Sequence, residues 1–216
     1  MRMRKRNWVD PLMNKENELL IKDHHKIKEI SNNFKEVYLE IGSGLGHFIL
    51  ELAMLNPDKL YFAFEKDYIC SAKMLKLFKA NKDKLNNNLF IINDNAINLQ
   101  KFFTNASIDG IYLLFSDPWP KKGHHKRRLS AESFLKIYYD LLKDNGYIYQ
   151  KTDNFDLYDY SKLSYQNSKL FQIIIDSTDF HNEIKDNLPL SAYEQKFLNA
   201  GNKIYHLKIE KLAKHN

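Results

Sequence analysis

VYLEIGSGLG, at residues 37–46, decides the fold of this chain. Its first five residues form an apolar run of strand length, and the glycines Gly42, Gly44 and Gly46 follow. Glycines at these positions permit a tight strand-to-helix turn and a close approach of the backbone to a ligand. A dinucleotide-binding turn of the G-x-G-x-x-G type would need its third glycine where this chain has His47.

Strands and helices alternate on both sides of this stretch. Helices are predicted at residues 15–31, 44–55, 68–85, 96–103, 130–143 (with Ser130 as its cap) and 154–168. Further strands are predicted at residues 60–64, 89–92, 110–115 and from 146, and then at 171–175 and 204–209 with a loop and a short helix between them. This alternation favours a mainly parallel sheet with helices on both faces, in which the last two strands form an antiparallel edge.

The composition is that of an ordinary globular protein with a modest basic excess. The 216 residues fit one domain, predicted at residues 13–216, after a short basic arm at residues 1–12. The net charge of +6 favours a polyanionic partner only weakly, because charge distribution matters more than the sum. A single cysteine, Cys70, excludes an internal disulfide and a cysteine zinc cluster. We find no apolar stretch of membrane length and no secretory signal, so we expect a cytoplasmic protein with no membrane partner.

Acidic residues recur at the carboxyl ends of the first five predicted strands. Glu40 lies just inside the first strand end, and Glu65, Asp94, Asp117 and Asp153 follow the next four. Each alone is explained by turn chemistry, because aspartate is common in turns. Ligands of α/β sheets bind outside the carboxyl ends of the strands, so the coincidence over five strands predicts a binding site there.

Two of these positions have specific interpretations and specific alternatives. Glu65 can accept hydrogen bonds from ribose hydroxyls, as acids at this position do in nucleotide-binding folds. The alternative is a solvated pair with its neighbour Lys66. The segment Asn93-Asp94-Asn95 can contact an adenine amino group, and the alternative is a plain turn.

The segment FSDPWP, residues 115–120, is unusual for a strand end. Its two prolines restrict the backbone and remove two main-chain donors, so Asp117 is predicted to be held rigidly. Trp119 is then presented beside it, and a fixed carboxylate next to an aromatic ring suits a flat base.

A basic run, KKGHHKRR, follows directly at residues 121–128. Charge runs are usually solvated loops, but the position of this one after the predicted site favours contact with phosphates. His124 and His125 have no cysteine or aspartate at ligand spacing, so no metal site is expected.

These residues resemble a known family, the bacterial tRNA (guanine-N7-)-methyltransferases, over most of the chain. The resemblance rests on LEIGSG at 39–44, FE at 64–65, Asp94, FSDPWPKK at 115–122, KRRL at 126–129, KTD at 151–153 and SAYE at 191–194. The Asp-Pro-Trp segment with Lys-Arg-Arg behind it is specific to that family, whereas Glu-x-Gly-x-Gly occurs in many methyltransferases. The resemblance implies a Rossmann-like class I methyltransferase fold with a mainly parallel seven-stranded sheet.

The resemblance also implies roles for individual residues, with S-adenosylmethionine as the cofactor and Asp117 at the catalytic centre. The predicted cofactor-binding residues are Glu40, Gly42, Gly44, Gly46, Glu65, Asp94, Asn95 and Asp117. The predicted substrate-binding residues are Lys121, Lys126, Arg127, Arg128, Asp153, Ser191, Tyr193 and Glu194. The basic start, residues 1–8, resembles the family's arginine-rich arm. Two departures are Ser191, where the family often has threonine, and Gly123, where a basic residue is common.

The implied reaction is methylation of a variable-loop guanine in tRNA to 7-methylguanosine. Guanine N7 carries an in-plane lone pair and needs no deprotonation, so the enzyme mainly aligns the reacting atoms. Asp117 or Asp153 is expected to accept hydrogen bonds from the N1 and amino protons of the base. The sequence leaves the oligomeric state open, with a homodimer among the states it allows.

Three alternative functions are weighed against this one. A nucleotide-dependent oxidoreductase keeps the fold and Glu65 but does not explain His47. A non-catalytic RNA-binding module explains the basic run but not the row of carboxylates. A methyltransferase acting on an exocyclic amine typically has Asn/Asp-Pro-Pro-aromatic at strand four, where this chain has Trp119 in place of the second proline.

Overall fold

A computed structural model of the chain describes residues 7–15, 17–184 and 186–213. The chain divides after Phe103 into two compact units, residues 1–103 and residues 104–216. Residues 1–6 of the predicted basic arm lie outside the described residues. The boundaries of one domain at residues 13–216 therefore stay a prediction, and each unit is described by itself.

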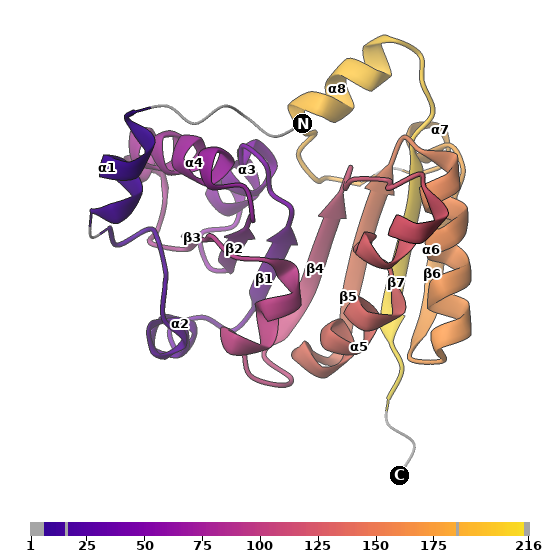
Figure 1. The fold of residues 1–216 in the computed structure, drawn as a ribbon, viewed down its shortest axis with the longest axis horizontal. Coiled ribbons are helices and arrows are strands. Elements are labelled where there is room, and N and C mark those ends of the chain that lie inside the picture. Colours follow the sequence, from indigo (N-terminus) through magenta and orange to yellow (C-terminus); the bar gives the residue numbers. More distant parts are fainter. Residues whose placement is uncertain (1–6, 16, 185, 214–216) are drawn as a thin grey trace. The chain divides into compact units, whose positions relative to one another are not determined.

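Three parallel strands form the centre of the first unit. They are β1 (Val37–Ile41), β2 (Leu60–Phe64) and β3 (Leu89–Ile92), with β2 in the middle (Figure 1). Every residue of the three strands is buried, as is typical of parallel strands covered on both faces. The predicted bounds of all three strands are confirmed.

Helices and short 3-10 segments pack around these strands. They are α1 (Val9–Asn14), α2 (His24–Ser31), α3 (His47–Leu55), α4 (Tyr68–Ala80), η1 (Lys82–Lys84) and η2 (Ala96–Lys101). The α3 helix packs on β2, and α4 contacts both β3 and α1 (Figure 1). Helix α3 begins at His47 rather than Gly44, because Gly44 and Gly46 have the left-handed φ angles of 56° and 76°.

The predicted helix at residues 15–31 is wrong over its first half. Leu20 instead forms a parallel bridge with Ile91 on the outer side of β3, and the Ile21 N–H donates to the Ile91 carbonyl at 2.8 Å. The apolar run Leu19–Ile21 is buried in this extended conformation. The helix starts only at His24, after Asp23 has capped it by accepting from the His25 N–H. Pairing with a distant strand therefore overrides the local helical pattern.

The second unit contains four strands, β4 (Ile108–Leu114), β5 (Leu142–Thr152), β6 (Phe171–Ser177) and β7 (Tyr205–Lys211). β4 and β5 are parallel, whereas β7 is antiparallel to both β5 and β6. The predicted antiparallel pairing of the last two strands is confirmed, with β7 lying between β5 and β6. Exposed residues alternate along β6, so its faces are covered less completely than those of the first three strands.

Helices connect these strands and follow them. They are η3 (Lys122–Arg127), α5 (Glu132–Leu141), α6 (Phe155–Ser168), α7 (Phe180–Glu183) and α8 (Ala192–Asn199). The α6 helix packs on β6 and β7 (Figure 1). The prediction that Ser130 caps α5 is wrong, because its hydroxyl lies 2.6 Å from the Ser161 hydroxyl in the interior and Ala131 holds the cap position. Among the described residues, the helices are all too short or too polar to cross a bilayer.

Candidate functional site

The glycine loop, residues 42–46, leads from β1 into α3 with three left-handed glycines. The φ angles of Gly42, Gly44 and Gly46 are 78°, 56° and 76°. A Cβ atom at Gly46 would lie 2.5 Å from Met74 Cγ, so this glycine lets α3 and α4 approach closely. A Cβ atom at Gly44 would have nothing within 4 Å. Gly46 therefore has a packing role, whereas Gly44 leaves the loop accessible to a ligand.

Gly46→Ala is expected to lower the free energy of unfolding by about 2–4 kcal/mol, because it combines a left-handed φ with a clash against buried Met74. Gly44→Ala adds only the left-handed strain and is expected to cost about 1–2 kcal/mol. Urea unfolding of both variants measures the difference. Equal losses would contradict the packing role of Gly46.

Glu65 ties the glycine loop to the end of β2. Its Oε2 atom accepts a hydrogen bond from the Gly44 N–H at 2.9 Å, and its Oε1 atom accepts from the Asp67 N–H at 2.7 Å. The residue is buried, which does not support the alternative of a solvated pair with Lys66. Each carboxylate oxygen has a second lone pair, so Glu65 can accept further hydrogen bonds from a ligand.

Glu40 is a buried acid in β1, two residues before the glycine loop. Its Oε2 atom has no hydrogen-bond partner among the described residues, although the residue is only 4% exposed. Burial raises the pKa of this carboxyl from 4.5 to about 8, and the charge of Glu65 acts in the same direction. Buried polar atoms are nearly always hydrogen-bonded, so an orphaned acceptor at a strand end fits a donor supplied by a ligand.

Glu40 gives the ligand-free protein a testable pH dependence. Because the folded carboxyl keeps a proton that the unfolded chain releases near pH 4.5, stability falls as the pH rises from about 4.5 to about 8. The expected slope from this residue is about 1.4 kcal/mol per pH unit. Glu40→Gln removes this pH dependence. The melting temperature of the variant, measured relative to that of the parent protein, should therefore rise from pH 5 to pH 8. Parallel stability curves for the two proteins would exclude this role of Glu40.

The three residues after β3 have different local roles, and Asp94 among them offers a half-buried carboxylate. The Asn93 amide donates to the Glu65 carbonyl at 2.8 Å, and Asn95 caps η2 by accepting from the Ile97 N–H. Asp94 Oδ1 accepts from the Asn95 N–H at 2.6 Å and from the Asn98 amide at 2.8 Å. The turn alternative therefore describes Asn95, whereas Asn93 supports the end of β2. Cofactor contacts of Asp94 and Asn95 stay predictions.

In the second unit, the Asp117 loop (residues 115–121) follows β4 with a strained backbone. Phe115 and Trp119 have left-handed φ angles of 50° and 42°, which bulky residues rarely adopt. Such strain persists where the surroundings fix the conformation, and it is common at functional sites. The Phe115 N–H donates to the Lys151 carbonyl at 2.9 Å. The loop presents an exposed Asp117 between these two left-handed residues, and the rigid hold on its side chain stays a prediction.

The basic run after the loop has an outer and an inner part. Lys121, Lys126 and Arg127 are exposed, and the Arg127 guanidinium lies 5.0 Å from the Trp119 ring centroid. These three side chains can reach phosphates. Arg128 differs from the prediction: it is 2% exposed, and its Nε donates to the Pro118 carbonyl at 2.8 Å. Burial also lowers its pKa, and a side chain in this place cannot clamp an RNA backbone from the surface.

Asp153, after β5, is brought together with Tyr193 of α8. The Tyr193 hydroxyl donates to Asp153 Oδ2 at 3.4 Å, and burial together with Asp153 raises the tyrosine pKa. The Tyr193 ring centroid lies 4.9 Å from that of Phe115, and the ring stacks on Phe197 with the centroids 4.6 Å apart. Ser191 caps α8 by accepting from the Glu194 N–H at 3.0 Å. Asp153 and Tyr193 thus form a polar and aromatic patch that suits a base.

Glu194 lies in the interior rather than at the surface. It is 0% exposed, and its Oε1 atom is 2.8 Å from the Nζ of Lys151, which is 1% exposed. His181 Nε2 lies 3.1 Å from the same oxygen, and Lys151 Nζ lies 3.8 Å from the Phe180 ring centroid. Direct contact of Glu194 with a substrate is therefore not supported. Lys151 belongs to the KTD motif but received no predicted role from the sequence, although a lysine at the end of an apolar strand indicates a buried acidic partner.

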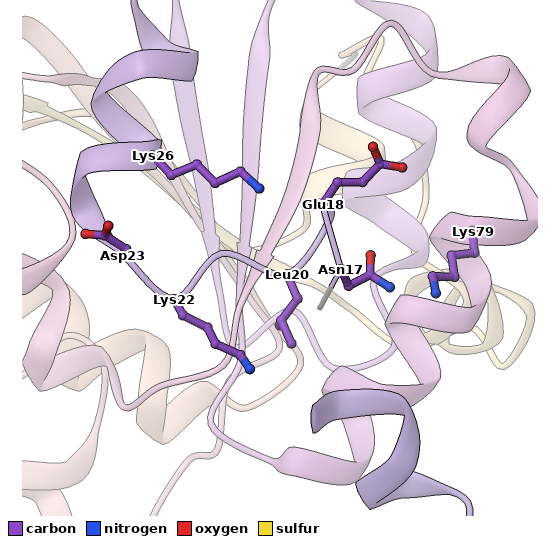
Figure 2. Close-up of a pocket in the computed structure, with 7 residues that line it drawn as sticks. All are labelled: Asn17, Glu18, Leu20, Lys22, Asp23, Lys26 and Lys79. Atoms are coloured by element: carbon purple, nitrogen blue, oxygen red, sulfur yellow. The ribbon is translucent and has the colours of Figure 1, made fainter. Parts of the chain in front are cut away.

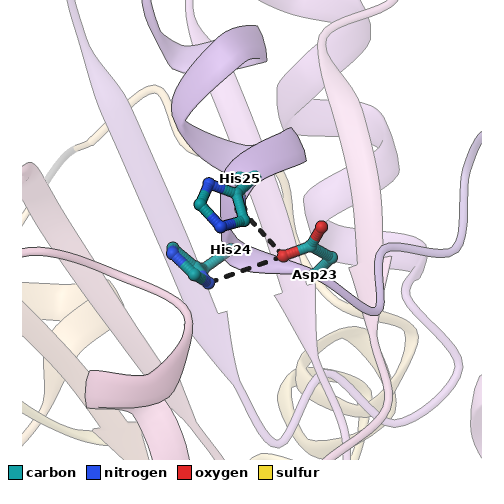
Figure 3. Close-up of side chains that lie close together, drawn as sticks. All are labelled: Asp23, His24 and His25. Atoms are coloured by element: carbon teal, nitrogen blue, oxygen red, sulfur yellow. Dashed lines mark hydrogen bonds and ion pairs between the residues drawn. The ribbon is translucent and has the colours of Figure 1, made fainter.

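Two other clusters lie in the first unit. Figure 2 shows a pocket lined by Asn17, Glu18, Leu20, Lys22, Asp23, Lys26 and Lys79, none of them a predicted site residue. In Figure 3, the Asp23 carboxylate accepts a hydrogen bond from the main-chain N–H of His25 at 3.0 Å and lies 3.5 Å from His24 Nδ1. All three side chains are exposed, and the positive end of α2 disfavours a cation. We assign this cluster to helix capping.

Several solved methyltransferases share this fold. The 16S rRNA methyltransferase KamB superposes with a TM-score of 0.68 at 12% identity, covering 89% of this chain and 95% of that one. A variant of the 16S rRNA (adenine(1408)-N(1))-methyltransferase from Catenulisporales acidiphilia, solved with cosubstrate SAM, gives a TM-score of 0.64 at 11% identity, covering 91% and 94%. The fold is that of the class I methyltransferases, as predicted.

Sequence comparison narrows the class to one family. A family model described as "Putative methyltransferase" matches residues 35–207. A protein of Mycoplasma mycoides subsp. mycoides SC, named tRNA (guanine-N(7)-)-methyltransferase, is 40% identical over 222 residues, which cover 98% of this chain and 100% of that protein. The chain belongs to the tRNA (guanine-N7-)-methyltransferase family, as its motifs predicted.

Proposed function

We propose that the protein transfers the methyl group of S-adenosylmethionine to N7 of a guanine in the variable loop of tRNA, which forms 7-methylguanosine. The observation that carries this proposal is the Asp117 loop, where an exposed carboxylate between two left-handed residues is followed directly by exposed cations. The names of the relatives support tRNA and guanine N7 as the target. With tRNA as the substrate, we propose that the protein acts in the cytoplasm.

S-adenosylmethionine supplies an electrophilic methyl group on a positively charged sulfur. In the first unit, the glycine loop, Glu40, Glu65 and Asp94 are the residues that would hold it. The orphaned Glu40 oxygen fits a donor of the ligand, and Glu65 fits the ribose hydroxyls at the end of β2. The neighbour solved with SAM has the same fold, which supports this choice of cofactor.

The reaction requires the protein mainly to align the reacting atoms and to stabilise the developing positive charge. Guanine N7 attacks through its lone pair, the bond between sulfur and methyl breaks, and the positive charge passes to the purine. Asp117 is proposed to accept hydrogen bonds from the base and to stabilise this developing charge. Asp153, which accepts from Tyr193, is proposed to help hold the base. Lys121, Lys126 and Arg127 are proposed to bind the phosphates.

The test uses an unmodified tRNA transcript, labelled S-adenosylmethionine and analysis of the nucleosides. We expect label in 7-methylguanosine alone. A matched transcript with 7-deazaguanosine at the target position lacks the nucleophilic nitrogen and should accept no label. Label in a methylated adenosine or at another guanine atom would overturn the proposal. So would equal labelling of the two transcripts.

A further inference from the structure

We propose that Arg128 is a positioning residue that fixes the Asp117 loop from inside the second unit. This inference rests on the proposed function, because it concerns how the proposed catalytic carboxylate is held. It assigns to Arg128 a role different from that of its neighbours Lys126 and Arg127, which are exposed.

The contacts of Arg128 run inward in three directions. Its Nε donates to the Pro118 carbonyl at 2.8 Å, directly after Asp117 in the chain. Its Nη1 donates to the Asp156 carbonyl at 3.4 Å, in the first turn of α6. The guanidinium also lies 4.5 Å from the Tyr160 ring centroid. The side chain therefore connects the loop to α6, and its 2% exposure leaves no donor surface for a phosphate.

The Asp117 loop needs such a support because it is poor in main-chain donors. Pro118 and Pro120 have no N–H, and Phe115 and Trp119 hold left-handed φ angles. Regular secondary structure cannot fix a backbone of this kind. A buried guanidinium that donates to the Pro118 carbonyl replaces the missing hydrogen bonds and so restricts where Asp117 points.

The geometry requires arginine and not simply a positive charge. The planar guanidinium donates to two carbonyls in different directions while its face packs on Tyr160. A lysine ammonium carries the same charge, but it cannot combine both bonds with the stacked arrangement. We therefore expect Arg128→Lys to lose much of the support.

The first experiment separates positioning from phosphate binding in the full-length protein. Arg128→Ala is expected to lower kcat by about 100-fold through misplacement of Asp117, while the KM for tRNA and the salt dependence of binding stay near those of the parent. Arg128→Lys should show a smaller fall in kcat with the same unchanged salt dependence. Arg127→Ala is the matched comparison: it should weaken tRNA binding and reduce the slope of log K against log salt by about 1.

The second experiment measures the solvent accessibility of Trp119 in the Asp117 loop and involves no methyl transfer. The chain has two tryptophans, so Trp8→Phe leaves Trp119 as the sole reporter. In that background, Arg128→Ala should raise the quenching of Trp119 by acrylamide, and Tyr160→Leu should raise it partly, whereas Tyr160→Phe keeps the ring and should not. Where Arg128→Ala fails to fold, Arg128→Lys carries the same comparison.

These readouts also separate this inference from the proposed function. Unchanged quenching with weaker binding and a flatter salt dependence would show a phosphate contact and overturn the positioning role. If Arg128→Ala raises the quenching of Trp119 but the parent protein forms no 7-methylguanosine, the proposed function is overturned and the support of the loop by Arg128 stands.

Discussion

Asp117→Ala is expected to lower kcat for tRNA methylation by about 100- to 1,000-fold, the usual cost of removing a preorganised group that stabilises developing charge. In our proposal, this carboxylate accepts hydrogen bonds from guanine and stabilises the positive charge that reaches the purine. Because the side chain is exposed, its loss should leave folding intact. Single-turnover methylation with saturating tRNA and cofactor measures the chemical step apart from binding.

Asp156→Asn is the matched control for this substitution. Its side chain is exposed, and it is the Asp156 main-chain carbonyl that accepts from Arg128. The control should therefore react at nearly the parent rate. Asp117→Asn keeps the shape of the side chain without its charge, and it should resemble Asp117→Ala. Turnover by Asp117→Ala close to that of the parent would remove Asp117 from the catalytic centre.

Lys151→Met is expected to destabilise the protein by about 3–5 kcal/mol, the usual cost of removing one partner of a buried ion pair, because His181 alone then remains of the two basic side chains beside the Glu194 Oε1 atom. Lys151 and Glu194 are 1% and 0% exposed, and their charged atoms are 2.8 Å apart. The pair connects β5 to α8, the helix that carries Tyr193 next to Asp153. The free energy of unfolding from urea titrations measures the loss.

The double variant Lys151→Met/Glu194→Leu tests the cause of this loss. Replacing both charges by apolar side chains of similar volume also removes the buried carboxylate that has lost its lysine partner, so most of the lost stability should return. An additive loss in the double variant would instead assign the effect to packing of the lysine stem. A loss below about 1 kcal/mol for Lys151→Met alone would place the pair in the range of surface ion pairs.

The sequence predicts best where buried strands dominate. The apolar runs at residues 37–41, 60–64 and 89–92 match β1, β2 and β3 residue by residue, because strands buried on both faces need continuous apolar sequence. The helix predicted at residues 15–31 fails because Leu20 pairs with Ile91, a contact that no local pattern reveals. Predictions that depend on neighbours along the chain therefore hold better than those that depend on distant partners.

The same limit applies to the candidate site. The motifs locate the glycine loop, the Asp117 loop and the basic run, but a charge run does not say which side chain turns inward. Arg128 is distinguished from Arg127 only by the Pro118 carbonyl and by Tyr160, which belongs to another helix. Glu194 and Lys151 are 43 residues apart, so their pairing also appears only in the folded chain.

The extended segment Leu19–Ile21 has a practical meaning for anyone who shortens this protein. Its main chain exchanges hydrogen bonds with Ile91, and it thereby covers the outer side of β3. Unpaired strand edges recruit strands from other molecules and promote aggregation. A recombinant fragment that starts at Lys22 would expose this edge, so a soluble truncation should begin upstream of Leu19.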